Sequence, residues 1–301
     1  MFGDQRSVLI APASHPRMPQ RAVESAADVV VLDLEDAVAP SEKAQARAAV
    51  VRSLRDLDWR DRPRRYRVNG LETPFFYRDL IDVLEIAGEL VDAVVVPKVE
   101  RPEDVYVVST LLSQIEAQIG LRQPIGIDVQ IETALGLRHC EAIAAASLRV
   151  RSVVFGPGDY AASVGMPLTA IGVADEWDEV YPGHRFHDAM HRILVAGRAA
   201  NVRVIDGPYA ALRDAAGLRR SCAIARALGY DGKWCIHPEQ IETVNEVFSP
   251  SAEEIEWARR VVRAAEEAER RGDGAAVLNG RMIDGASVRV ARAALARDRQ
   301  L

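Results

Sequence analysis

Short apolar segments rich in β-branched residues recur along the chain, and amphipathic segments separate them. Eight such segments predict β-strands: residues 7–12, 29–36, 65–70, 93–99, 125–132, 151–159, 203–208 and 233–238. Parallel strands that alternate with helices are typical of α/β proteins, and eight of them favour a closed barrel. The pattern therefore predicts an α/β fold of the (β/α)8 TIM-barrel type.

The segments between these strands have apolar residues at helical spacing, and several begin with Ser, Asp or Pro, residues that favour a helix start. The expected helices cover residues 16–27, 41–54, 103–119, 139–147 and 215–229. Two connections are longer than the others. Residues 165–190 are expected to form a loop insertion, and the second long segment is the tail after Pro238.

The tail has its own helical pattern. The segment 249–272 predicts a strong helix, with Ser251 as its N-cap, Glu253 and Glu254 in its first turn, and Gly272 after its end. A second helix is expected over residues 286–299. A complete barrel does not need these residues, so we expect a catalytic barrel over residues 1–240 and a C-terminal helical extension over residues 241–301.

Composition limits the cellular setting. Apolar residues make up 49% of the chain, the net charge is −6, and the basic residues are scattered, so no nucleic-acid partner is expected. No apolar run approaches the roughly 18 residues of a membrane span, and no secretion signal is recognisable at the N-terminus. Three widely spaced cysteines suggest no disulfide framework. These features predict a cytoplasmic protein without a membrane partner.

Lysine is rare in this chain. Only Lys43, Lys98 and Lys233 are lysines among 38 basic residues. Lys98 falls at the end of one predicted strand and Lys233 at the start of another. This placement suggests that a compact ammonium is needed there rather than a guanidinium.

Polar residues follow nearly every predicted strand. The residues at these ends are Glu35 and Asp36, Arg67 and Asn69, Lys98 and Glu100, Glu132 and Thr133, Asp159, Asp206, and His237. The carboxyl ends of barrel strands meet at one rim, where active sites form. Ionised groups close to a core are costly unless they are paired or bind a metal. The acids are therefore expected to share a pocket.

A divalent cation would relieve the repulsion between carboxylates that converge on this pocket. A few oxygen ligands with open positions suit Mg²⁺, which keeps bound water. Arg67 could bind a substrate carboxylate with two hydrogen bonds. The turn formed by Gly156, Pro157 and Gly158 would let the backbone approach a ligand. Such a site could stabilise an enolate or an alkoxide formed from an α-keto acid.

Each of these residues has a simpler interpretation. Glu35 and Asp36 could complement a helix dipole, Glu132 with Thr133 could cap a helix, Arg67 could form an ordinary salt bridge, and Asp159 could belong to a turn. These readings explain poorly why all the residues fall at one rim. His187 and His191 have a helical spacing that can bind zinc, but the glutamate of an HExxH motif is missing, so packing or surface roles are favoured for them and for His184.

Several motifs carry a family resemblance. They are RSVLIAPAS, DVVVLDLEDAVAPSEKAQAR, RVNGLETP, VVPKVE, IETALGL, FGPGDYAAS, IDGPYA, GKWCIHPEQI, VNEVFSP and RMIDG. In order and spacing the chain resembles the citrate lyase beta subunit-like family of the HpcH/HpaI aldolase superfamily. That family includes the malyl-CoA, β-methylmalyl-CoA and citramalyl-CoA lyases. The similarity runs from about Arg6 to about Asp284.

The resemblance implies particular roles. Glu132 and Asp159 match the family's Mg²⁺ ligands, with Mn²⁺ as an alternative metal, and Arg67 matches the arginine that binds the substrate carboxylate. Glu35 and Asp36 match acids that act through metal-bound water. Asp284 matches an aspartate that enters the active site of a neighbouring subunit and acts on the acyl-CoA, which implies a homotrimer or homohexamer.

Further contacts with the CoA part of the substrate also follow only from the resemblance. The phosphates of CoA are expected near Arg17 or Lys43. Lys98, the turn of residues 156–158 and Pro208 are further candidates for substrate binding. Two features depart from many relatives: PASHP, with His15, follows the first strand, and the 165–190 insertion, including YPGHRF at 181–186, resembles the malyl-CoA type and could shape the acyl pocket.

The resemblance implies Mg²⁺-dependent, reversible cleavage of a 3-hydroxyacyl-CoA such as malyl-CoA, β-methylmalyl-CoA or citramalyl-CoA. The products would be an acyl-CoA and glyoxylate or pyruvate. A malyl-CoA thioesterase with water as nucleophile, a subunit of a carrier-dependent citrate lyase-like complex, and an aldolase independent of CoA are alternatives. The MID segment around Asp284 favours a free-standing CoA enzyme.

Overall fold

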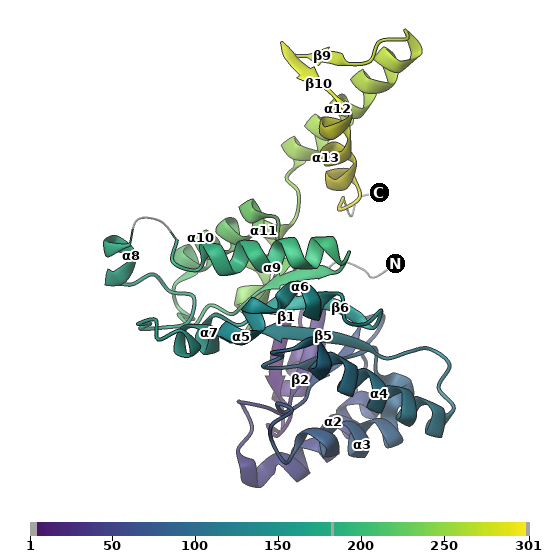
Figure 1. Ribbon diagram of the computed structural model, residues 1–301, viewed down its shortest axis with the longest axis vertical. Coiled ribbons are helices and arrows are strands. Elements are labelled where there is room, and N and C mark those ends of the chain that lie inside the picture. Colours follow the sequence, from purple (N-terminus) through teal and green to yellow (C-terminus); the bar gives the residue numbers. More distant parts are fainter. Residues whose placement is uncertain (1–4, 182–183, 299–301) are drawn as a thin grey trace. The chain divides into compact units, whose positions relative to one another are not determined.

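The computed structural model describes residues 5–181 and 184–298 (Figure 1). It divides into two compact units, the first ending at Asn245 and the second beginning at Glu246.

The first unit contains a closed barrel of eight parallel strands. They are β1 (Ser7–Pro12), β2 (Val29–Asp33), β3 (Arg64–Arg67), β4 (Ala93–Val96), β5 (Gly126–Ile131), β6 (Val150–Phe155), β7 (Arg203–Asp206) and β8 (Gly232–Cys235). Each strand pairs with the next one in sequence, and β8 closes the barrel on β1, with Val8 opposite Trp234. The TIM-barrel prediction is confirmed.

Helices connect the strands and surround the barrel, and one more helix follows β8 (Figure 1). They are α1 (Met18–Glu24), α2 (Lys43–Asp56), α3 (Phe76–Ala87), α4 (Pro102–Ile119), α5 (Ala134–Arg138), α6 (Cys140–Ala144), α7 (Pro157–Ser163), α8 (Glu176–Val180), α9 (His187–Ala199), α10 (Ala215–Leu228) and α11 (Gln240–Phe248), with 3-10 turns η1 (Pro40–Glu42) and η2 (Gly88–Leu90). The five helices expected in this unit are present. Gly120 follows the last residue of α4, and its φ of 71° gives the left-handed cap that glycine adopts most easily.

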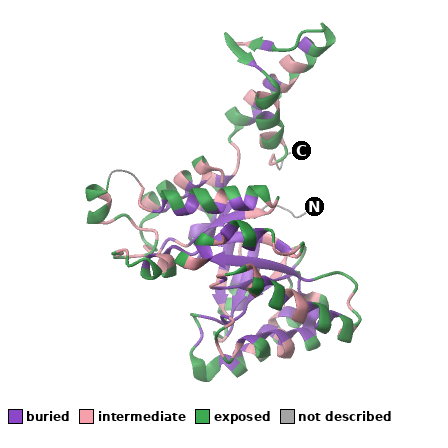
Figure 2. Cartoon of the chain, viewed as in Figure 1, coloured by how far each residue is buried: buried purple, intermediate pink, exposed green. Residues whose placement is uncertain are grey.

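Apolar side chains form a cluster in the barrel, which also contains a buried ion pair between Arg65 and Asp128. The cluster inside the barrel consists of Val8, Val29, Val31, Val95, Val154, Ile205 and Trp234, with Ile10 packed against it. The strands are buried almost throughout, as Figure 2 shows. Along β5, Asp128 and Gln130 alternate with apolar residues, and Glu132 continues this alternation beyond the strand. One strand therefore carries polar side chains to the rim.

Some element boundaries differ from the prediction. β2 ends at Asp33, so Glu35 and Asp36 lie in the following loop. β6 ends at Phe155, and a helix begins at Pro157, so Asp159 lies in the first turn of α7 and not at a strand end. The segment 165–190 was expected to be a loop, but it contains α8 and the start of α9. Proline at the first helical position explains the early start of α7.

The second unit has a small core of its own. α12 (Ala252–Arg270) begins after Ser251, whose side chain accepts a hydrogen bond from the N–H of Glu254, as expected for the N-cap. The short antiparallel strands β9 (Ala276–Leu278) and β10 (Arg281–Ile283) follow, and then α13 (Gly285–Leu295). Alanines of α12 and α13 pack with Val261, Ala276 and Ile283 in this core.

The hairpin of β9 and β10 was not predicted, although the sequence contains its signal. Asn279 and Gly280 both have positive φ, 52° and 74°, as a two-residue type I′ turn requires. Each strand has only three residues, too few to show a clear alternation.

Every helix in the described part of the chain is too short or too polar to span a membrane.

Candidate active site

A cavity of about 470 Å³ opens at the C-terminal end of the barrel. Its polar side chains are Asp36, Arg67, Gln130, Glu132 and Asp159, and its apolar side chains include Ile10, Met166, Leu168, Ile171, Trp234 and Ile236. Gly156, Pro157, Gly158 and Pro208 complete the lining. The structure thus brings together Asp36 after β2, Arg67 at the end of β3, Glu132 after β5 and Asp159 in α7, with Pro208 after β7.

Arg67 is held in place by acids from the neighbouring strand and its loop. Its Nε and Nη2 donate to the two oxygens of Asp33 at 2.7 and 2.8 Å, and Nη1 lies 2.7 Å from Oε2 of Glu35. Although burial raises the pKa of Asp33, the guanidinium of Arg67 outweighs this effect and lowers it. The ring of Trp234 lies 5.5 Å below the guanidinium. These contacts fix the orientation of Arg67 and leave further N–H donors for a ligand.

Glu132 is buried and strongly perturbed. Its Oε1 accepts a hydrogen bond from the backbone N–H of Lys98 at 2.8 Å, and its Oε2 accepts one from Nε2 of Gln130 at 3.3 Å. Burial, with the negative charges of Glu35 and Asp159, raises the pKa of Glu132 to about 8. A Cβ atom at Gly156 would lie 2.2 Å from Oε2, so only glycine leaves room for this carboxylate.

Lys98 does not line the cavity, but its ammonium lies close to three of the acids. Its Nζ pairs with Glu35 and lies 3.7 Å from Asp36 and 3.9 Å from Asp159. Burial lowers the pKa of Lys98, but the hydrogen bond and charge of Glu35 outweigh burial and raise it. For Glu35, burial dominates and raises the pKa.

The donor set of this site fits a divalent cation. Five carboxylates (Asp33, Glu35, Asp36, Glu132 and Asp159) lie around Arg67 and Lys98. The ammonium of Lys43 also interacts with the charges of Asp33, Glu35 and Asp36. Oε1 of Gln130 is buried and accepts no hydrogen bond from the described residues, and Oε2 of Glu35 is buried with the ion pair to Arg67 as its contact. In residues 5–181 and 184–298, no three His, Cys, Asp or Glu side chains group around a metal position. The arrangement therefore suits a Mg²⁺ ion that is bound by two carboxylates and keeps water as its other ligands better than an ion bound by protein groups alone.

Lys43 was expected near a CoA phosphate, and in the structure its ammonium is engaged by the protein backbone. Its side chain is buried, and Nζ donates to the backbone oxygens of Leu34 and Glu35 at 2.6 and 2.7 Å. The ammonium supports the loop that carries the acids. Arg17 is exposed just before α1, where its backbone N–H and that of Met18 donate to Nδ1 of His15, both at 3.2 Å.

Asp284 belongs to the second unit. It is exposed and caps α13, with Oδ1 accepting hydrogen bonds from the N–H and hydroxyl of Ser287. The backbone hydrogen bond from Ser287 lowers the pKa of Asp284.

Three features of the site were missed from the sequence. Asp33 holds Arg67, and Gln130 contacts Glu132, yet both lie within apparently apolar strands. Alternation along β2 and β5 could have indicated their inward positions. The apolar wall of Met166, Leu168 and Ile171 comes from the insertion, which has no regular pattern that could have revealed it. Within the YPGHRF stretch, Pro182 and Gly183 lie outside the described residues.

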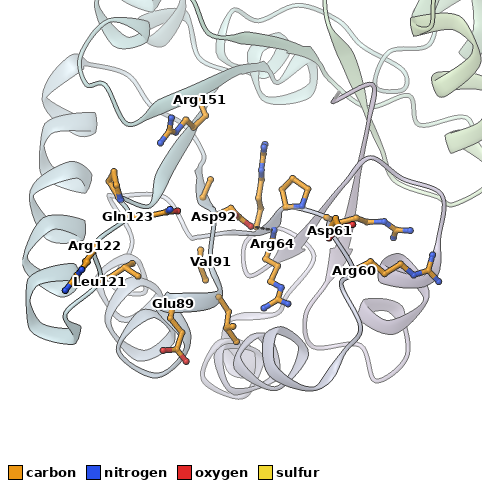
Figure 3. Close-up of a pocket in the computed structure, with 17 residues that line it drawn as sticks. Arg60, Asp61, Arg64, Glu89, Val91, Asp92, Leu121, Arg122, Gln123 and Arg151 are labelled. Atoms are coloured by element: carbon orange, nitrogen blue, oxygen red, sulfur yellow. Dashed lines mark hydrogen bonds between the residues drawn. The ribbon is translucent and has the colours of Figure 1, made fainter. Parts of the chain in front are cut away.

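The other cavities and the histidines are less suited to catalysis than this site. A cavity of about 810 Å³ lies at the N-terminal ends of β3 to β6 and is rich in arginine, but Arg60 and Arg122 point away from it on opposite sides (Figure 3). His187 and His191 stack on α9 with ring centroids 5.8 Å apart. His184 lines a separate cavity of about 550 Å³.

Comparison with known proteins agrees with this geometry. Residues 6–238 match the family described as HpcH/HpaI aldolase/citrate lyase. The chain belongs to this family. The resemblance seen in the sequence motifs is therefore confirmed, and the protein is an enzyme of an aldolase and lyase family.

Relatives within the HpcH/HpaI family show two activities. The chain is 42% identical to an L-malyl-CoA/β-methylmalyl-CoA lyase of Cereibacter sphaeroides, over 95% of this chain and 92% of the relative. It is 37% identical to a (3S)-malyl-CoA thioesterase of the same species, over 97% and 94%. The structure of CitE from Mycobacterium tuberculosis, in complex with magnesium, acetoacetate and coenzyme A, matches with a TM-score of 0.77 and 29% identity over 99% of both chains.

Proposed function

We propose that this protein is a Mg²⁺-dependent lyase that reversibly cleaves a 3-hydroxyacyl-CoA of the malyl-CoA or β-methylmalyl-CoA type into an acyl-CoA and a 2-oxo acid. The main support is the cavity that combines Arg67, Glu132 and Asp159 at one rim. The 42% identity to a lyase of this specificity over nearly the whole chain supports the substrate class.

Glu132 and Asp159 are the proposed metal ligands, with Glu35 and Asp36 acting behind them through bound water. A bound divalent cation would polarise the oxygens of the 2-oxo acid as a Lewis acid. Arg67 would bind the carboxylate of this acid, because its guanidinium lines the cavity in a fixed orientation. The backbone around Gly156 and Gly158 would lie against the substrate.

Cleavage needs one proton to leave the substrate hydroxyl and another to reach the acyl carbon. As the C–C bond breaks, its electron pair passes to the thioester as an enolate, and protonation of the α-carbon completes the acyl-CoA. We assign the transfer at the α-carbon to Asp284 of a neighbouring subunit: its carboxylate takes this proton from the acyl-CoA in the condensation direction and returns it in cleavage, while the hydroxyl proton passes to water. This assignment makes a homotrimer or homohexamer part of the proposal. Asp284 is exposed and sits on a separate compact unit, which suits a residue that acts on another chain.

The apolar wall would accommodate the acyl substituent. Met166, Leu168 and Ile171 line one side of the cavity, and Ile10 and Ile236 contribute further apolar surface. A methyl group on the carbon next to the thioester would be buried against these apolar side chains, and no polar group would lose a hydrogen bond.

The 37% identity to a malyl-CoA thioesterase supports hydrolysis as a second candidate function. Both activities can be tested in one reaction. Purified protein is mixed with Mg²⁺, glyoxylate or pyruvate, and acetyl-CoA or propionyl-CoA, and thioesters, free CoA and organic acids are followed by chromatography. A lyase accumulates the 3-hydroxyacyl-CoA without releasing CoA, whereas a thioesterase releases free acid and CoA. Absence of both outcomes with every pair would overturn the proposal.

A further inference from the structure

Ile171 lies in a tight turn of the insertion between α7 and α8. The N–H of Val173 donates to the backbone oxygen of Ala170 at 3.2 Å, and Gly172, the third residue of the turn, has a φ of 73°. A type II turn requires a positive φ at this position, which glycine adopts most easily. Ile171, the second residue of the turn, therefore extends from a backbone of defined conformation.

The loop after β7 holds this turn in place. The N–H of Ala210 donates to the backbone oxygen of Ile171 at 2.8 Å. A Cβ atom at Gly172 would lie 2.7 Å from the backbone oxygen of Pro208, so only glycine lets the turn pack this closely against the loop. The position of Ile171 is thus tied to the barrel and does not depend on the insertion alone.

Arg185 joins the segments before and after the turn. Its Nη1 donates to the backbone oxygen of Pro167 at 2.7 Å, its Nη2 to Oδ1 of Asp175 at 2.7 Å, and its Nε to Oδ1 of Asp178 at 3.0 Å. These contacts hold the insertion in one shape around Ile171. A surface that is fixed in this way selects ligands by size, because a larger group would have to displace it.

The side chain of Ile171 borders the cavity beside the proposed metal ligand Asp159. A Cβ atom at Gly158, the residue before Asp159, would lie 2.9 Å from Cδ1 of Ile171 and 3.1 Å from its Cγ1. Ile171 is 36% exposed and lines the cavity. Branching at Cβ leaves its side chain few rotamers, whereas the unbranched Met166 of the same wall adapts easily. Ile171 is therefore the stiffer limit on the size of a ligand.

Arg67 and Ile171 belong to opposite sides of the barrel. Arg67 ends β3, whereas Ile171 is bound to the loop after β7, and these two strands lie opposite each other in the closed ring of eight. In the proposed reaction Arg67 binds the carboxylate of the 2-oxo acid. The C–C bond joins the acyl α-carbon to the carbon next to this carboxylate, so the α-carbon and its substituent extend away from Arg67.

We propose that Ile171 sets the largest substituent that the acyl α-carbon can carry, so that the site accepts a hydrogen atom or a methyl group and excludes an ethyl group. The inference rests on the proposed function, because it concerns the acyl-CoA of that reaction. It assigns the limit to one residue of the apolar wall. One methylene group beyond such a limit lowers kcat/KM by about 10- to 200-fold.

The experiment compares thioesters that differ by one carbon. Acetyl-CoA, propionyl-CoA and butyryl-CoA are each mixed with glyoxylate and Mg²⁺, and kcat/KM is measured from the 3-hydroxyacyl-CoA and its free acid together. The wild type is expected to use butyryl-CoA at least about tenfold less well than propionyl-CoA, and Ile171→Ala should remove most of this difference. Ile171→Phe should lower the ratio of propionyl-CoA to acetyl-CoA at least about tenfold. Leu168→Ala, the control from the same wall, should keep the wild-type ratios.

A binding measurement separates size selection from turnover. The Kd values of the three thioesters, measured by calorimetry without a 2-oxo acid, should change in the same order as kcat/KM in each variant. Wild-type ratios in Ile171→Ala, or an equal change in Leu168→Ala, would overturn the inference while the proposed function stands. Equal use of butyryl-CoA and propionyl-CoA by the wild type would overturn it as well. If the wild type converts none of the thioesters with glyoxylate or pyruvate, the proposed function is itself wrong and the inference falls with it.

Discussion

The backbone N–H of Lys98 donates a hydrogen bond to Oε1 of Glu132 at 2.8 Å, which joins the segment after β4 to the residue that follows β5. A backbone donor thus orients the proposed metal ligand, and the ammonium of the same residue lowers the pKa of Glu132 against the raising effect of burial. The left-handed conformation of Lys98 accompanies this contact. The geometry of the acids therefore depends on backbone conformation as well as on side-chain chemistry.

Glycine at position 156 is predicted to be necessary for metal binding. In Gly156→Ala the new Cβ would lie 2.2 Å from Oε2 of Glu132, so the carboxylate must move. We expect Mg²⁺ affinity, measured by calorimetry, to fall at least about tenfold, and overpacking to destabilise the fold by about 1–3 kcal/mol. Gly158→Ala is the control, because its Cβ would meet only the end of the Ile171 side chain, at 2.9 Å. Unchanged Mg²⁺ affinity in Gly156→Ala would contradict the prediction.

Replacing Glu132 by glutamine is predicted to lower activity and to raise the thermal stability of the metal-free protein. Glu132→Gln is expected to lose Mg²⁺ binding and to reduce turnover more than about a hundredfold, since a metal ligand is lost. Because the carboxylate is buried among other acids, the same change should raise the Tm of the metal-free protein. Thermal melting in EDTA and steady-state kinetics measure the two effects. Asp159→Ala should likewise abolish Mg²⁺-dependent turnover, and full activity in either variant would refute the metal assignment.

Metal binding is predicted to strengthen as pH rises. The pKa of Glu132 is raised to about 8 from an ordinary value of 4.5, so below pH 8 a proton competes with the metal. The Mg²⁺ affinity should weaken by about tenfold for each pH unit below 8 and level off above it. In the metal-free protein, the folded state holds a proton that the unfolded state has lost between these two pKa values. The Glu132 contribution to the free energy of unfolding therefore decreases as pH rises from 4.5 to 8.

This pH dependence can be measured from the Mg²⁺-induced shift in Tm at pH 6.5, 7.5 and 8.5. Glu132→Gln serves as the control. Because it lacks the titrating carboxyl, position 132 should make no contribution to any pH dependence of its Mg²⁺-induced shift in Tm. A Tm shift in the wild type that is equal at all three pH values would show that Glu132 is not the titrating ligand.

Asp33 is predicted to support Arg67 without contacting the substrate. Asp33→Asn removes the charge that holds a buried guanidinium, and breaking a buried ion pair costs about 3–5 kcal/mol. We expect a lower free energy of unfolding in urea and a higher KM for the 2-oxo acid. A variant with wild-type stability and KM would show that Glu35 alone can position Arg67.

The role of Asp284 can be separated from its helix cap. Asparagine caps a helix about as well as aspartate, whereas alanine costs about 1 kcal/mol. Asp284→Asn should therefore keep the wild-type Tm but lose most C–C cleavage, while Asp284→Ala should lose both stability and activity. If Asp284→Asn retains full kcat, the proton-transfer assignment is wrong. Mixing Asp284→Asn with an Arg67→Ala variant should restore part of the activity if the residue acts on a neighbouring subunit.

Much of the fold could be predicted because its signals are local. The β-branched segments, the helical spacing between them and the cap at Ser251 each span only a few residues, and the barrel follows from their number and order. The rim was predictable as well, since polar residues end most strands and parallel strands place those ends together. Pro157 indicates the start of α7, and Asn279 with Gly280 indicates the hairpin. Both signals are short, and the longer strand and helix patterns did not include them.

The amino-acid sequence by itself determined the barrel, the family and the rim where the acids gather. Only the tertiary structure decided how those acids are paired: Asp33 with Arg67, 34 residues away, and Glu35 with Lys98, 63 residues away. Strand patterns depend on neighbouring residues, whereas the charge state and orientation of a buried side chain depend on partners that only packing brings into contact. For that reason Lys43 proved to be a buried support for a loop, and Lys98 a cation held among carboxylates.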